Sequence, residues 1–100
     1  MTEIALQPPA SVEVWDSFIH NGTLYYALLN RNANYRAEVH RRRPNGVIEQ
    51  LWIGSAQFKY ASISISALGT SLIVTYSRAS GRDSKTPYRP YMLTIANVVN

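Results

Sequence analysis

The chain has 100 residues, of which 46% are apolar and only 16% are charged, and this length and balance predict one globular domain spanning residues 1–100. The absence of cysteine excludes disulfides and thiolate metal sites, and no apolar run is long enough for a transmembrane helix. The net charge of +4 permits an anionic partner without requiring one.

Alternating and β-branched or aromatic runs follow one another along the chain and predict an all-β fold of about eight antiparallel strands. A short first strand at 3–6 is stopped by the two prolines that follow it. The next strand, at 12–19, leads into a hairpin turn at Asn21-Gly22, because this pair adopts positive φ at low cost. The strand at 23–30 is apolar on both faces, which is typical of strands covered from both sides.

Two turn signals bound the strands that follow. The asparagine-rich residues 30–34 predict a turn before a strand at 35–42, and Pro44 to Gly46 predict another before a strand at 47–53. Within the first of these strands, the side chains expected to share one face are Tyr35, Ala37 and Val39.

The second half of the chain contains the clearest two-residue period. Residues 60–67 alternate serine with apolar side chains, so Ile63 and Ile65 are expected to face the core. Strands at 71–78 and 88–97 follow, separated by a polar loop.

An internal echo divides the chain into two units. Residues 19–29 are matched by residues 67–76, and the pattern predicts two blade-like meanders, 12–53 and 60–97, with the strand at 3–6 completing the second. Two such units are too few to close a propeller, so further copies of the chain or a partner would have to complete the fold. A β-sandwich or jelly roll is the alternative arrangement of the same strands.

The first unit resembles blades of the sialidase-type (Asp-box) propeller repeat. The run Asn21-Gly-Thr-Leu-Tyr-Tyr-Ala is similar to the second strand of such blades, and the turn from Pro44 to Trp52 lies where they carry the Asp-box. Asn45 stands in place of the aspartate and Arg43 in place of the serine, and the second unit has no counterpart of this turn. The resemblance implies a blade fold and no activity, because no catalytic residue of sialidases matches a position here.

The titratable residues are few and widely spaced. No nucleophile triad, glycine-rich phosphate loop or metal-ligand spacing is present. We therefore expect no enzyme activity, no catalytic, cofactor-binding or metal-ligating residue, and no cofactor.

Aromatic side chains near strand ends are candidates for an interface or a ligand site, although each is also compatible with the core. These candidates are Trp15, Trp52, Tyr88 and Tyr91.

A basic run at Arg41, Arg42 and Arg43 is the second candidate, because planar guanidinium groups bind phosphate and carboxylate bidentately. The alternative is a solvated hairpin tip that protects a sheet edge from aggregation. A second basic group could add to the positive field, but its loop at 78–88 is expected at the opposite end of its sheet from the turn at 42–47, unless the two units are offset. This group consists of Arg78, Arg82, Lys85 and Arg89. We therefore do not expect nucleic acid as a partner.

These features favour a non-enzymatic, self-associating structural protein, such as a phage capsid decoration or tail protein. A glycan-binding, lectin-like module is the first alternative, and a basic nucleic-acid-binding β module is the second. The expected partners are further copies of the chain or other subunits of an assembly, with a glycan as the alternative and no membrane. The N-terminus lacks the features of a secretory signal, which predicts cytoplasmic synthesis and, for a virion component, location in the particle.

Overall fold

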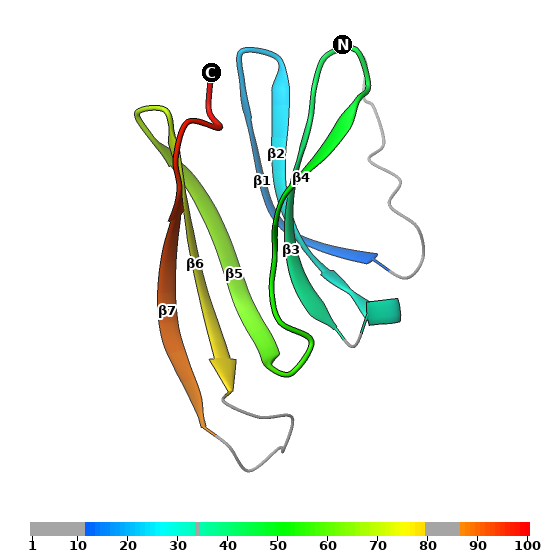
Figure 1. The fold of residues 1–100 in the computed structure, drawn as a ribbon, viewed down its shortest axis with the longest axis vertical. Helices are drawn as coiled ribbons and strands as arrows, with labels where there is room; N and C mark the ends of the chain where they lie inside the picture. Colours follow the sequence, from blue (N-terminus) through cyan, green and yellow to red (C-terminus); the bar gives the residue numbers. More distant parts are fainter. Residues whose placement is uncertain (1–11, 34, 80–86) are drawn as a thin grey trace.

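The computed structural model describes residues 12–33, 35–79 and 87–100, which form two antiparallel sheets and no α-helix (Figure 1). Sheet A contains, in order, β1 (Val12–His20), β2 (Thr23–Asn30), β3 (Arg36–Arg42) and β4 (Ile48–Ile53). Sheet B contains β5 (Lys59–Leu68), β6 (Ser71–Ala79) and β7 (Tyr88–Ile95). The predicted all-β class is confirmed, and seven of the predicted strands are found. The strand predicted at 3–6 lies outside the described residues.

Each sheet is a meander, and tight turns set its register. Asn21 and Gly22 have φ values of 51° and 78°, so the predicted Asn-Gly hairpin between β1 and β2 is confirmed. Gly46, with a φ of 89°, closes the β3–β4 turn, where the Arg43 N–H donates to the Val47 carbonyl oxygen (2.9 Å). These two turns lie at the same end of sheet A, because a Cβ at Gly22 would be 3.2 Å from the Pro44 ring.

The two sheets stack face to face and enclose one core (Figure 1). Ile63 and Ile65 are buried, at 2% and 8% exposed, so the core face predicted for 60–67 is confirmed. Burial of an aliphatic side chain of this size contributes roughly 1.5–3 kcal/mol. The other buried members of this core are Tyr25, Ala27, Leu29, Ala37, Val39, Tyr60, Leu72, Val74 and Val99.

Polar contacts join the two sheets along the side where β1 meets β5 and at the end near the C-terminus. β1 and β5 are edge strands of their own sheets and lie beside each other, and the Ile65 N–H of β5 donates to Asp16 Oδ2 of β1 (2.9 Å). Near the C-terminus, the Val98 carbonyl oxygen accepts a hydrogen bond from Tyr25 Oη (2.6 Å). The Val98 and Val99 N–H groups both donate to the Thr70 carbonyl oxygen (3.0 Å).

Three β-bulges interrupt the alternation that the sequence suggested. The extra residues are Trp15 in β1, Leu51 in β4, and one residue of the Ser62–Ile63 pair in β5. A bulge reverses the facing of the residues beyond it. Trp52, opposite Val39, therefore lies on the core side of sheet A together with Leu51.

The segment before β3 differs from its prediction. Arg31–Ala33 form a short 3-10 turn, and Tyr35 has a φ of 57°. The strand begins at Arg36, so Tyr35 is 51% exposed and does not share the buried face of Ala37 and Val39. The prediction for Tyr35 was wrong because the left-handed backbone before the strand turns its side chain out of the alternating pattern.

Candidate functional site

Stacked aromatic rings connect sheet A to the free edge of sheet B. Trp52 of β4 stacks on Tyr76 of β6, with ring centroids 5.4 Å apart and planes at 29°. Tyr76 in turn stacks on Tyr91 of β7, at 5.8 Å and 16°. These three rings, here called the aromatic ladder, fill the space between the sheets on the side away from β1 and β5, because the bulge at Leu51 brings Trp52 to the core side.

Tyr60 packs beside the ladder and is fixed at its hydroxyl. Its ring meets Trp52 edge-on at 6.1 Å, and its Oη accepts a hydrogen bond from the Ser55 N–H (2.8 Å). Burial raises the pKa of Tyr60, so this phenol is neutral at physiological pH. Gly54 lies against the ring, and no side chain fits at that position without displacing it.

Arg78 lies between two aromatic rings at the end of sheet B where β5 and β7 begin and β6 ends. Its guanidinium carbon is 3.7 Å from the centroid of Phe58 and 4.2 Å from that of Tyr91. Cation–π contact on both sides holds the guanidinium in place while leaving its N–H donors at the rim of the plane. Within the described part of the chain, Arg78 forms no side-chain hydrogen bond or ion pair.

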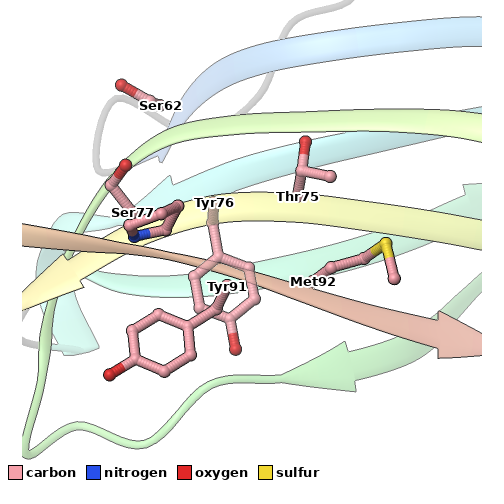
Figure 2. Close-up of a pocket in the computed structure, with 7 residues that line it drawn as sticks. Ser62, Thr75, Tyr76, Ser77, Tyr91 and Met92 are labelled. Carbon is pink, nitrogen blue, oxygen red and sulfur yellow. The ribbon is translucent and has the colours of Figure 1, made fainter.

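An open groove of about 410 Å³ runs along the outward face of sheet B, which is the face that points away from sheet A (Figure 2). Its lining includes Ser62 at the β5 bulge, with a φ of 54°, together with Thr75, Ser77 and Met92. In Figure 2 the Tyr76 ring points to the other side of the sheet, toward the aromatic ladder. Pro90, Tyr76 and Tyr91 complete the lining, so the groove presents hydroxyl groups, a thioether, a proline ring and parts of two tyrosines.

Two of the three arginines in the predicted basic run have a structural role. Arg41 donates to both oxygens of Glu49 (3.2 and 3.1 Å) and to the Val98 carbonyl oxygen (2.8 Å), and Arg43 donates to Glu49 Oε1. Hydrogen bonds from Arg41 and Arg43 lower the pKa of Glu49 from 4.5 to about 2. Arg42, which points to the outer face of sheet A, is exposed and has no ion pair with a described residue.

Glu38 is a buried carboxylate on the outer face of sheet A. Its Oε1 contacts His40 Nε2 (2.9 Å) and accepts from Gln50 (3.1 Å), whereas its Oε2 accepts from Asn30 and Arg36 (both 3.1 Å). Burial alone would raise the pKa of Glu38, but the bonds from His40, Asn30 and Arg36 outweigh it and hold the pKa below its ordinary value. Every acceptor position is used internally, so this cluster stabilises the sheet.

The structure brings some of the sequence-predicted candidates together and separates others. Trp52 and Tyr91 join through Tyr76 of β6. Tyr88 is 44% exposed at the start of β7, and Trp15 is 38% exposed at the β1 bulge. The sequence did not indicate Phe58 and Tyr60 as candidates, and it indicated Arg78 only as part of the second basic group. The two-residue spacing of Tyr76 and Arg78 is the one local signal that they share a face of the strand.

In the part of the chain that the structure describes, no cluster of three or more histidine or acidic side chains is arranged to hold a metal ion. The described residues also contain no helix long and apolar enough to cross a membrane. Searches of family models, of curated proteins and of solved structures found no match to this chain. The resemblance to sialidase-type blades therefore stays a prediction.

Proposed function

We propose that this chain is a non-enzymatic structural module that associates with further copies of itself through the outward face of sheet B. The observation that carries the proposal is the chemistry of that face. Two cross-strand rows on it contain only uncharged side chains, which are Ser64, Thr75 and Met92 in one row and Ser66, Ile73 and Thr94 in the other.

The solvated face of an antiparallel sheet is usually polar, and charged side chains are depleted at the centre of a protein interface. Met92 is 69% exposed in the middle of β7, and the groove beside it leaves room for a side chain from another molecule. These features support contact with protein.

The outer face of sheet A supplies a complementary apolar surface. Ile19, Leu24 and Ile48 lie with Arg42 in one row across all four strands, and Ile19 and Ile48 are 70% and 56% exposed. Packing sheet B of one copy onto sheet A of the next would continue the stacking already present within the chain. Such a head-to-tail contact forms a closed ring if the rotation between copies closes. A ring of this kind fits the predicted blade repeat and a subunit of a larger particle such as a virion.

The alternative of a glycan-binding module has weaker support. Sugar rings are commonly bound by stacking on aromatic side chains. Tyr76 and Tyr91 are among the residues that line the groove, but their rings already stack on each other. The aromatic ladder itself is packed between the two sheets.

The test is the mass in solution, measured by light scattering behind a sizing column at about 100 μM, where weak self-association becomes visible. We expect a discrete multiple of 11.3 kDa. Thr75→Arg places a charge at the centre of the proposed contact and should yield a monomer with unchanged thermal stability. Asn32→Arg adds the same charge in the exposed 3-10 turn and should leave the mass unchanged. A wild-type protein that remains at 11.3 kDa would contradict the proposal.

A further inference from the structure

The charge of the chain is distributed unevenly between its halves. Residues 1–50 contain five arginines and five acidic residues, whereas residues 51–100 contain five basic residues and one acidic residue. The whole net charge of +4 therefore comes from the half that builds sheet B. In sheet A, by contrast, ion pairs with Glu13, Glu38 and Glu49 neutralise most of the arginines.

The strand register gathers the described cations of sheet B at one end. Arg78 of β6 lies directly opposite Arg89 of β7, and Lys59 of β5 is opposite Ala79, one residue further along β6. This end is at the bottom of Figure 1, where β6 ends and β7 begins. Like charges directly opposite on neighbouring strands destabilise a sheet. None of these three side chains forms an ion pair with a described residue, so the arrangement would be stabilised by an anion.

Aromatic rings lie among these cations. Phe58 and Tyr91 hold the Arg78 guanidinium between them, so little side-chain freedom is lost when its free donors bind a ligand. Tyr88 is 44% exposed and lies next to Arg89 in β7, and the described contacts include no stacking partner for its ring. We call Phe58, Lys59, Arg78, Tyr88, Arg89 and Tyr91 the basic-aromatic end of sheet B.

We propose that the basic-aromatic end binds single-stranded nucleic acid, as a second activity beyond self-association. By the register, Lys59 and Tyr88 lie on one face of sheet B, and Arg78 and Arg89 lie on the other, so the bound strand passes around the end of the sheet. Lys59, Arg78 and Arg89 contact phosphate groups, and the exposed Tyr88 ring stacks on a base. This combination of cations along a backbone and an aromatic face for bases is how proteins bind single strands without sequence preference. Nucleic acid was not expected from the sequence because its two basic groups, 41–43 and 78–89, were predicted at opposite ends of their sheets, and both were assumed to be needed for binding. Arg41 and Arg43 are occupied by Glu49, but the second group is sufficient by itself.

The test is fluorescence anisotropy of a labelled oligothymidine strand, titrated with protein at several salt concentrations. Three phosphate contacts predict that log K falls against log salt with a slope of about −2, at about 0.7 for each contact. Arg89→Gln should weaken binding and reduce this slope by about 0.7. Arg31→Gln removes the same charge from an exposed arginine of the 3-10 turn, outside both proposed surfaces, and should change neither. Arg78→Gln should act like Arg89→Gln, and the mass of each variant shows whether a loss of binding follows from a loss of assembly.

The contribution of base stacking on Tyr88 can be measured separately from that of the phosphate contacts. Tyr88→Leu keeps an apolar side chain and should lower affinity about fivefold or more while leaving the salt slope unchanged. Three outcomes would overturn the proposal. They are no binding at low salt, equal effects of Arg31→Gln and Arg89→Gln, or binding of heparin fragments as tight as that of the oligonucleotide and insensitive to Tyr88→Leu.

Discussion

Gly54 is the position where the structure makes its sharpest prediction about stability. It is buried after β4, and its N–H donates to the Ala37 carbonyl oxygen (2.8 Å). A Cβ added here would lie 2.6 Å from both Cζ and Oη of Tyr60. That ring cannot retreat easily, because it is 5% exposed, lies among Trp52 and other aromatic rings, and is fixed by the Ser55 N–H.

The expected cost of Gly54→Ala follows from these contacts. Forcing one methyl group into a packed site costs about 1–3 kcal/mol, and loss of the Ser55 hydrogen bond to Tyr60 adds about 1 kcal/mol. The reduced freedom of the unfolded chain returns about 0.4–1 kcal/mol. The net loss is about 1–3.5 kcal/mol, which for a domain of this size lowers Tm by roughly 5–25 °C.

A double-mutant cycle measured by urea unfolding tests the cause. Tyr60→Leu removes the two ring carbons and the hydroxyl oxygen that crowd the new methyl group, so in that background Gly54→Ala should cost less than about 0.5 kcal/mol. The reasoning is refuted if Gly54→Ala alone is neutral, or if its cost is the same in both backgrounds.

Three further predictions concern the core and the contacts around it. Ile65→Ala should lower the free energy of unfolding by about 2–4 kcal/mol in urea titrations, and a loss below about 0.5 kcal/mol would mean that Ile65 does not face the core. Asp16→Ala should cost about 1.5–3 kcal/mol because it leaves the Ile65 N–H without an acceptor, whereas Asp16→Asn, which keeps an acceptor oxygen, should cost clearly less; equal losses would rule out the hydrogen bond as the cause. Because the pKa of Glu49 is lowered from 4.5 to about 2, its ionised form stabilises the folded state above pH 4.5, and this contribution is lost as the pH falls toward 2. Thermal melts of Glu49→Gln between about pH 6 and pH 2 should therefore fall less steeply than those of the wild type, and parallel curves would contradict the ion pair.

The strands could be predicted because their signals are local. Alternation and the Asn21-Gly22 turn place most strand ends within two residues of their observed positions. The bulges at Trp15 and Ser62 could not be predicted, because an extra residue changes the facing of a strand without changing its composition. Their positions depend on how each strand meets the other sheet.

The candidate site was predicted only in part, for a similar reason. The hairpin around Gly46 sets Arg41 opposite Glu49, and that ion pair follows from the strand register. The stack of Trp52 on Tyr76, however, joins two sheets whose relative placement no local pattern specifies. The same holds for Arg78, whose two ring partners come from different segments of the chain.

The meander connectivity has a consequence for the order of folding. Every hydrogen-bonded pair of the described strands joins neighbours in the chain, so these pairings have low sequence separation and form early. The contacts that join the sheets bridge distant positions, because Asp16 and Ile65 are 49 positions apart in the sequence and Tyr25 and Val98 are 73 apart. Docking of two preformed meanders is then the late step. We expect substitutions in the Gly22 turn to slow folding and Asp16→Ala to accelerate unfolding, a difference that stopped-flow kinetics resolves.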